Sequence, residues 1–280
     1  MIKLDCNDLY QEKNQKIKEM LLDCNKGAKL ATLRVGEDLG SISYERALKK
    51  QCDQVGLKIE TYVLDEKSSD LLIRNTVLEL NEDKTVNGIL LFKPMPGDCD
   101  EDEIMELIHI NKDVDGCTSL NRNRLFNIDT YRNLPATAVA IIQYLKSITQ
   151  LSGKEVFIIN RSYTIGMPLF FMLLKENATV EVGHSKTLDI EEKMSRADII
   201  ITAVGRNKIF KPNNLKKDAI IIDMGYSLDE NGRASGDIDT ESIGNMDVSY
   251  MPSIGGIGKI TRGVILENVC LNYLGEYNGR

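Results

Sequence analysis

Residues 155–168 carry the side chains with the clearest chemical meaning in this sequence. An apolar run ends at Asn160, Arg161 and Ser162 follow, and a helix is expected to open near Gly166. A helix start offers unpaired backbone N–H groups and the positive end of a dipole, so strand–turn–helix units of this kind bind anions. A guanidinium matches a phosphate bidentately, so Arg161 with Ser162 favours NADP over NAD. A surface arginine in an ordinary turn is the alternative, because such motifs produce many false positives.

Composition narrows the class of protein. The chain has 280 residues, 42% hydrophobic and 28% charged, which is typical of a globular protein with one large or two ordinary domains. Its net charge of −7 argues against a nucleic-acid partner. Without an apolar run of about 18 residues or a signal-peptide core, we expect no membrane partner and a cytoplasmic location. Six scattered cysteines and two histidines argue against a disulfide framework, a metal site and a Ser-His-Asp mechanism.

Alternating strand and helix patterns predict an α/β protein with parallel strands and crossover helices. A polar amphipathic helix is expected at 7–26, closed by Gly27. The expected strands are 28–35, 58–64, 86–92, 155–159, 179–182, 197–204 and 219–224. The expected helices are 43–55, 69–81, 100–110, 136–148, 165–175, 190–195 and about the last 20 residues. Residues 111–135 read as irregular, and a connection of that length is usually functional.

This pattern predicts two domains, 1–138 and 139–261. The helix of 262–280 either closes the second domain or, as we expect, returns to the first. Ligands of parallel sheets lie beyond the carboxyl ends of the strands. The tails to examine are therefore 160–162, 183–187, 203–205 and 223–226, and Gly205 is placed where a backbone could approach a ligand closely.

These tails, together with motifs of the first half, resemble the methylenetetrahydrofolate dehydrogenase/cyclohydrolase family over nearly the whole chain. The matching segments of the first half are Ser41-Ile-Ser-Tyr44, Gly88-Ile-Leu-Leu-Phe-Lys-Pro-Met-Pro96, Lys112-Asp-Val-Asp-Gly116 and Pro135-Ala-Thr137. Those of the second half are Arg161-Ser162 with Ile165-Gly166 and Pro168, His184-Ser-Lys-Thr187, Ala197-Asp198-Ile199, Ile222-Asp-Met-Gly225, Gly236-Asp237 and Gly255-Gly-Ile-Gly258 followed by Thr261.

The resemblance implies an N-terminal α/β domain that binds folate, a Rossmann-like domain that binds NADP, and a homodimer. It also implies hydride transfer from 5,10-methylene-tetrahydrofolate to the nicotinamide, with NAD as the other possible cofactor. Many family members then hydrolyse the methenyl product to 10-formyl-tetrahydrofolate. The resemblance therefore indicates an oxidoreductase of one-carbon metabolism.

Individual residues match the family's site positions. Tyr44 resembles the aromatic residue that lines the folate pocket, and Asp115 the aspartate that accepts hydrogen bonds from the pterin. The alternative for Tyr44 is a helix residue packed in the hydrophobic core. The alternative for Asp115 is an ordinary turn residue, although Asp113 is the better candidate for that role. The family's cofactor positions correspond to Thr137, Asn160, Arg161, Ser162, Ser185, Ala203, Gly205, Tyr226 and Thr261. Arg161 and Ser185 would hold the 2′-phosphate.

The chain departs from the family at the pair that carries out hydrolysis. The family's lysine, four residues after the tyrosine, is Leu48 here, and the glutamine that partners it is Phe92. Neither hydrocarbon side chain can move a proton or hold a hydroxide. Lys49 is rotated by about 100° around the helix, and Lys93 is expected on the other side of the sheet. We therefore predict a dehydrogenase whose cyclohydrolase step is weak or lost.

The glycine loop also departs from the family pattern. Gly255, Gly256 and Gly258 remain as expected folate contacts, but the preceding proline is lost and Lys259 replaces a second one. Lys259 either meets the glutamate tail of the folate or is solvated. Three alternatives stay open: a fully bifunctional enzyme with a displaced lysine, a non-catalytic folate- or nucleotide-binding paralogue, and a dehydrogenase for another small molecule on the same scaffold.

Overall fold

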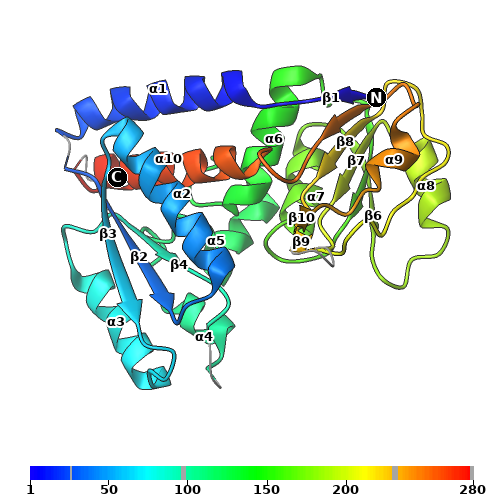
Figure 1. Cartoon of the computed structure of the whole chain (residues 1–280). Helices are drawn as coiled ribbons and strands as arrows, with labels where there is room; N and C mark the ends of the chain where they lie inside the picture. The colour runs from blue at the N-terminus through cyan, green and yellow to red at the C-terminus, as the bar shows by residue number, and fades with distance from the viewer. Residues whose placement is uncertain (26, 96–98, 229–232, 278–280) are drawn as a thin grey trace. The chain divides into compact units, whose positions relative to one another are not determined.

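The computed structural model describes residues 1–25, 27–95, 99–228 and 233–277, and it divides the chain into two compact α/β units (Figure 1). The three-strand unit consists of Tyr10–Ala136 and Arg262–Arg280, and the six-strand unit of Met1–Leu9 and Thr137–Thr261. Within the described residues, no helix combines the length and apolar character needed to cross a membrane. Pro96, the last residue of one family-like motif, Lys26 in the expected first helix and the last three residues of the expected final helix lie outside the described residues.

The three-strand unit is a parallel sheet with strand order β3-β2-β4. Its strands are β2 (Lys29–Val35), β3 (Lys58–Leu64) and β4 (Gly88–Leu91). Its helices are α2 (Leu39–Val55), α3 (Asp70–Glu82), α4 (Glu101–Glu106), α5 (Ser119–Asn123) and a 3-10 turn at Arg124–Asn127. It also contains α1 (Asn7–Asp23) from Tyr10 onward and α10 (Gly258–Tyr277) from Arg262 onward.

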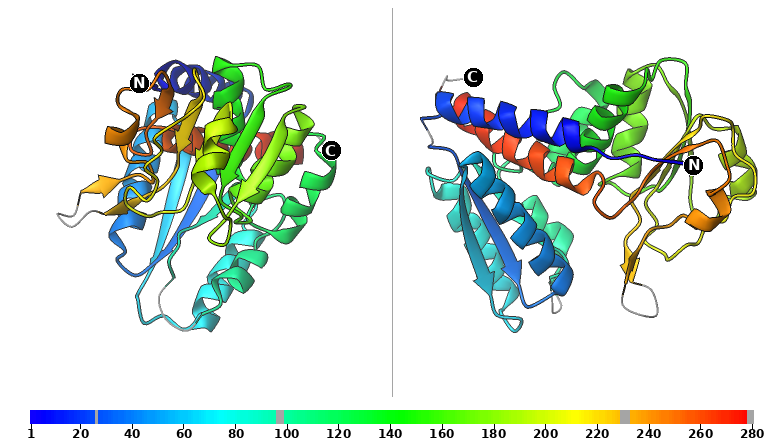
Figure 2. Two further views of the ribbon diagram at one scale, coloured as in Figure 1. Left: turned by 90° about the vertical axis from the view of Figure 1, so that its right-hand side faces the viewer. Right: turned by 45° about the horizontal axis from the view of Figure 1, so that its top comes forward.

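The two faces of this sheet are covered by different helices. Alternate residues of β2, among them Ala31 and Leu33, pack with Ile73 of α3 and Ile104 of α4. On the opposite face α10 approaches β4, and a Cβ added at Gly88 would lie 2.7 Å from a methyl carbon of Val269. Side chains alternate along a strand, so the even-numbered positions of β4 face away from α3 and α4. Helices α1 and α10 run side by side in Figures 1 and 2.

Helix α2 starts four residues earlier than the sequence pattern predicts. The Asp38 carboxylate accepts a hydrogen bond of 2.7 Å from the backbone N–H of Ser41, and this N-cap extends the helix back to Leu39. The helix ends at Gly56, which adopts a φ of 84° and donates its N–H to the carbonyl of Cys52. The cap and the glycine together fix which face of α2 carries Tyr44.

The six-strand unit contains an all-parallel sheet in the order β1-β11-β8-β7-β5-β6. The strands are β1 (Ile2–Lys3), β5 (Glu155–Ile159), β6 (Thr179–Gly183), β7 (Ile199–Thr202), β8 (Ile220–Asp223) and β11 (Ser249–Met251). The helices are α6 (Ala136–Ile148), α7 (Gly166–Lys175), α8 (Ile190–Arg196) and α9 (Thr240–Ile243), and a small antiparallel ladder joins β9 (Ser227–Leu228) to β10 (Ala234–Ser235). One apolar core lies between the sheet, α8 and α9.

Two expectations about the chain's organisation need correction. Residues 1–9 were expected in the first domain, but β1 pairs with β11 and this segment belongs to the six-strand unit. A helix was expected over 100–110, but α4 ends at Glu106. Asn81 explains this end, because its side chain accepts from the N–H of His109 and donates to the carbonyl of Leu107. From Arg262 onward the last helix belongs to the three-strand unit.

Candidate functional site

An aromatic pair lies at the end of β4 in the three-strand unit. Tyr44 of α2 and Phe92, the residue after β4, have ring centroids 6.0 Å apart at 70°. This edge-to-face packing is one of the preferred arrangements of two aromatic rings. The backbone N–H of Phe92 donates to the carbonyl of Leu33, which holds the residue against the sheet. The fold therefore brings Tyr44, predicted to line the folate pocket, next to Phe92, one of the two apolar residues predicted to leave hydrolysis without its polar pair.

Leu48 lies one helical turn after Tyr44 and is fully buried, with 0% of its surface exposed, while Phe92 is 6% exposed. Positions i and i+4 share a helix face. Tyr44 is therefore flanked by hydrocarbon at positions 48 and 92, the two positions at which the sequence analysis expected no group able to transfer a proton.

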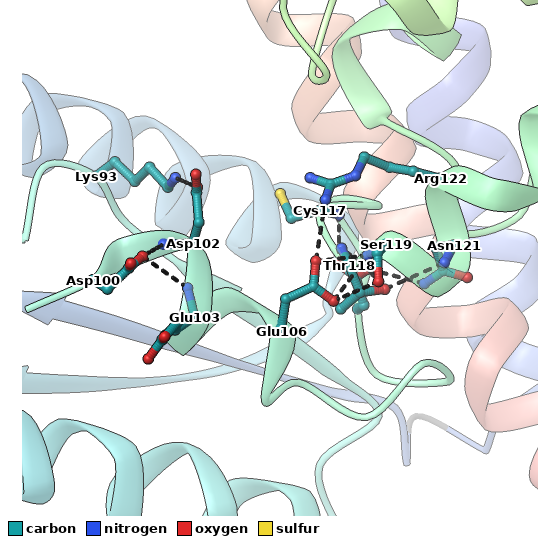
Figure 3. Close-up of polar contacts among 11 residues, drawn as sticks. Lys93, Asp100, Asp102, Glu103, Glu106, Cys117, Thr118, Ser119, Asn121 and Arg122 are labelled. Carbon is teal, nitrogen blue, oxygen red and sulfur yellow. Dashed lines mark hydrogen bonds and ion pairs between the residues drawn. The ribbon is translucent and has the colours of Figure 1, made fainter.

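The loop before α5 presents Asp115 next to a carboxylate that has a structural role. Asp113 accepts hydrogen bonds from the backbone N–H groups of Cys117 and Thr118, the Thr118 hydroxyl and the Asn121 amide. The residues that donate to it are labelled in Figure 3. Asp115 is half-buried, and its Oδ2 accepts from the Cys117 thiol at 3.4 Å. Asp113 is thus the turn-forming residue, as the sequence indicated.

Electrostatics around Asp115 favour its neutral form. Burial raises the pKa of Asp115 to about 7, and the negative charge of Asp113 adds to the effect. Burial also raises the pKa of Tyr44, and the negative charge of Asp115 contributes to that shift. At neutral pH, Asp115 is therefore able either to accept or to donate a hydrogen bond, whereas the Tyr44 hydroxyl stays protonated.

Two lysines near the aromatic pair are held by carboxylates. Lys49 Nζ lies 2.8 Å from Glu45 Oε1. Lys93 Nζ lies 3.0 Å from Asp102 Oδ1 on α4, as Figure 3 shows. Burial opposes the charge of Lys93, but the hydrogen bond to Asp102 and its negative charge outweigh burial and raise the pKa of Lys93. Lys93 thus stays charged and faces the acidic start of α4.

In the six-strand unit, Asn160 organises the turn between β5 and α7. Its Nδ2 donates to the carbonyl of Ala203 at 2.6 Å, and its Oδ1 accepts from the backbone N–H groups of Ser162 and Gly166 at 2.8 and 3.0 Å. A Cβ at Gly166 would lie 2.0 Å from the Asn160 carbonyl oxygen, so only glycine fits there. Asn160 thus joins the ends of β5 and β7 to the start of α7, while Arg161 is exposed.

A carboxylate that the sequence analysis did not single out holds the turn after β7. Asp237, fully buried, accepts from the consecutive backbone N–H groups of Val204, Gly205 and Arg206 at 2.6, 2.8 and 2.9 Å. Asp223 in turn accepts from the N–H groups of Asp237 and Ile238. Both aspartates stand in family-like motifs, and that was the only sequence signal for them.

The other predicted residues of the six-strand unit are spread along its loops and helix starts. Ser185 and Tyr226 are exposed after β6 and β8. Thr137 is the second residue of α6, and the Thr261 hydroxyl donates to the carbonyl of Ile257. In the glycine loop, Gly255 adopts a φ of 76°, a conformation that favours glycine. A Cβ at Gly256 would lie 2.1 Å from the Pro252 carbonyl oxygen, so a larger residue does not fit there, and Gly258 is the first residue of α10. Lys259 is not simply solvated, because its Nζ donates to the Asn7 side chain.

The residues that the structure describes contain no group of three or more His, Cys, Asp or Glu side chains arranged to hold a metal ion. The predicted site residues fall into two sets. Tyr44, Leu48, Phe92, Lys93 and Asp115 belong to the three-strand unit, and the rest to the six-strand unit.

Comparisons with known proteins match both halves of the chain. Residues 4–115 match the family model of the tetrahydrofolate dehydrogenase/cyclohydrolase catalytic domain, and residues 135–276 match its NAD(P)-binding domain. The chain is 39% identical over 245 residues to the bifunctional protein FolD of Clostridium botulinum strain Langeland, covering 86% of each chain. It is 35% identical over 272 residues to FolD of Staphylococcus epidermidis, covering 96% of this chain and 95% of that one.

A solved structure gives the same result. The bifunctional enzyme FolD, methylenetetrahydrofolate dehydrogenase/cyclohydrolase, from Campylobacter jejuni superposes with a TM-score of 0.92 at 31% identity, covering 99% of each chain. The NAD(P)-binding match thus covers the Rossmann-like sheet of the six-strand unit and continues into α10, and most of the catalytic-domain match lies in the three-strand unit. The chain belongs to the tetrahydrofolate dehydrogenase/cyclohydrolase family.

Proposed function

We propose that the protein oxidises 5,10-methylene-tetrahydrofolate to 5,10-methenyl-tetrahydrofolate with NADP, and that its cyclohydrolase step is weak or lost. The observation that carries the second part is the apolar wall of Leu48 and Phe92 beside Tyr44. Asp115 holds the pterin by accepting hydrogen bonds from its N–H groups, and Tyr44 lines the pocket.

The turn between β5 and α7 fits a dinucleotide phosphate. The exposed Arg161 stands beside Ser162 before its helix start, and the packing of Gly166 against Asn160 fixes the backbone of the turn. When bound, the nicotinamide cofactor supplies the hydride acceptor. Arg161 and Ser185 hold the 2′-phosphate, which is the basis for NADP rather than NAD. Asn160 and Asp237 keep the surrounding turns in place through backbone hydrogen bonds.

Hydride transfer requires little from the protein besides orientation and the exclusion of water, because the folate nitrogen stabilises the cation that forms. Hydrolysis of the methenyl product requires a group that takes and returns a proton near the added water. Leu48 and Phe92 offer none. Lys49 is paired with Glu45 and Lys93 with Asp102. A lysine whose amine is held in an ion pair with a carboxylate is a poor general base, which supports the loss of the second step.

Two assays on the purified protein test the proposal separately. NADPH formation from 5,10-methylene-tetrahydrofolate tests the dehydrogenase, and the decay of methenyl-tetrahydrofolate absorbance tests hydrolysis. We expect NADPH formation without enzyme-dependent decay above the buffer rate. Rapid enzyme-dependent decay contradicts the loss of hydrolysis, and absence of NADPH formation contradicts the dehydrogenase.

The double replacement Leu48→Lys with Phe92→Gln is the complementary test. It reintroduces the polar pair on the same helix face and strand end, so some hydrolysis is expected. The matched control, Leu48→Met with Phe92→Leu, repacks the same positions with hydrocarbon and should hydrolyse no faster than the unaltered protein. Equal hydrolysis by the two double variants contradicts the assigned role of these positions.

The family resemblance also supports a homodimer. Light scattering coupled to gel filtration should give twice the mass of the chain, and a monomer mass at micromolar concentration contradicts this part of the proposal.

A further inference from the structure

Arg262 lies next to the tyrosine of the proposed folate pocket. It is the first residue of α10 that belongs to the three-strand unit. Its guanidinium carbon lies 5.8 Å from the centroid of the Tyr44 ring, within the range of a cation–π interaction. Its Nε donates a hydrogen bond of 3.2 Å to Gln51 Oε1. A helix distant in sequence thus supplies a cation to this face of α2.

The contacts of Arg262 place its guanidinium along the turn that carries Leu48. Tyr44, Leu48 and Gln51 occupy positions i, i+4 and i+7 of α2, which share one face of a helix. The guanidinium meets Tyr44 toward the start of this row and Gln51 at its end. The positive charge therefore lies beside the position at which the family carries its lysine.

The position of Arg262 is fixed by its neighbours. Gln51 is buried, and its Nε2 donates to Asn14 Oδ1 at 2.9 Å, so the amide presents its oxygen to Arg262. One residue further along α10, a Cβ at Gly263 would lie 2.5 Å from Lys13 Cδ, so the helix packs closely on α1. Lys13 Nζ in turn lies 2.5 Å from Glu267 Oε2. These contacts anchor both helices next to the guanidinium.

The charge of Arg262 has no carboxylate partner within 4.0 Å among the residues described by the structure. Arg34 of the same unit shows the contrast, because its Nε lies 3.0 Å from Glu45 Oε2. Arg262 is half-buried, and one amide oxygen satisfies only one of the five N–H donors of a guanidinium. A partly buried cation of this kind is best satisfied by an acceptor from outside the chain.

We propose that Arg262 is a substrate-binding residue, which donates its remaining N–H groups to an oxygen acceptor of the bound folate. Its guanidinium also supplies a positive charge beside position 48, where the leucine side chain carries none. This inference rests on the proposed function, because it assigns the acceptor to the folate. A guanidinium stays protonated at any physiological pH, so it binds and orients but does not relay a proton. Arg262 thereby keeps folate binding and hydride transfer while leaving hydrolysis without a base.

The test compares Arg262→Met, which keeps the length of the side chain and removes the charge, with Arg262→Lys, which keeps a charge. Arg74→Met is the matched control, because Arg74 lies on α3 and pairs with Asp70 and Glu103 away from this pocket. Steady-state NADPH formation gives kcat and the KM of each substrate. Calorimetric binding of 5-formyl-tetrahydrofolate and thermal unfolding give readouts that do not depend on turnover.

Arg262→Met should raise the KM for methylene-tetrahydrofolate about tenfold, because one charge-assisted hydrogen bond to the folate is lost. Binding of 5-formyl-tetrahydrofolate by this variant should weaken to a similar extent. Its kcat and its KM for NADP should change by less than about threefold, Arg262→Lys should recover most of the loss, and Arg74→Met should match the unaltered protein. An unchanged folate KM in a folded Arg262→Met variant overturns the inference, as does an equal increase in both KM values.

A substrate without the glutamate tail, methylene-tetrahydropteroate, locates the acceptor. A loss that persists with this substrate places the contact on the pterin or benzoyl group, and a loss that disappears places it on the glutamate carboxylates; both outcomes support the inference. Absence of NADPH formation by the unaltered protein refutes the proposed function instead, and in that case folate binding by calorimetry still tests Arg262.

Discussion

The raised pKa of Asp115 predicts a pH dependence of folate use. In the proposed function the ionised carboxylate accepts hydrogen bonds from the pterin, so only the deprotonated enzyme binds folate productively. Burial raises the pKa of this group to about 7. The ionised fraction then rises from roughly 9% at pH 6 to roughly 90% at pH 8. We therefore expect kcat/KM for methylene-tetrahydrofolate to increase about tenfold as the pH rises from 6 to 8.

The assay is initial NADPH formation at subsaturating folate and saturating NADP, across pH 6–8, so that kcat/KM reports the free enzyme. An aspartate with the ordinary pKa of 3.8 is ionised throughout this range and predicts a flat profile. Asp115→Asn removes the titrating group, so its kcat/KM should be low and nearly independent of pH. A flat profile of the unaltered protein, or the same rise in Asp115→Asn, refutes the assignment.

The raised pKa of Asp115 also predicts that the stability of the folded protein falls as pH rises, whereas its activity increases. Between the ordinary pKa of 3.8 and about 7, the folded protein holds a proton on Asp115 that the unfolded chain releases. The contribution of this group to stability therefore falls as pH rises through that window. Asp115→Asn should be more stable than the unaltered protein at pH 8, by on the order of 1 kcal/mol because the side chain retains solvent contact, and equal to it below the window. Urea unfolding at the two pH values measures the difference.

Three further predictions concern other parts of the two units. Lys13→Met removes one of the two ion pairs of the mostly buried Glu267 and leaves only the pair with Lys16, so the free energy of unfolding should fall by about 2 kcal/mol. An unchanged midpoint of urea unfolding contradicts this prediction. Asp237→Asn replaces one oxygen of a carboxylate that accepts from three backbone N–H groups, so the KM for NADP should rise roughly tenfold with little change in the folate KM, and the same kinetic assay gives both values. Arg161→Ala should raise the KM for NADP about tenfold or more and leave that for NAD unchanged, whereas equal effects on both cofactors exclude a contact with the 2′-phosphate.

Much of the fold could be predicted because its signals are local. Helix α6 and strands β3 and β5 match the predicted bounds, and the apolar runs of β7 and β8 are central strands of a parallel sheet. Their apolar runs and periodicities reflect the burial of each element, and this pattern is present in the sequence itself. The family motifs likewise placed Tyr44 on α2 and Asp115 beside the turn that Asp113 forms.

Strands β1 and β11 were missed for the opposite reason. Each has two or three residues, and each becomes a strand only because a neighbour from a distant part of the sequence supplies its hydrogen bonds. The shortened α4 is a similar case, since a side chain of α3 takes the backbone groups that would continue the helix. No local pattern encodes a partner of this kind.

By itself, the sequence determined the alternation of strands and helices, the family, and the apolar side chains at positions 48 and 92, because each depends on residue type and spacing. Only the tertiary structure decided that Arg262 lies over Tyr44 and that Asp237 accepts hydrogen bonds from the backbone after β7. These are contacts between segments up to about 200 residues apart, and burial and charge at such contacts arise only when the chain has folded.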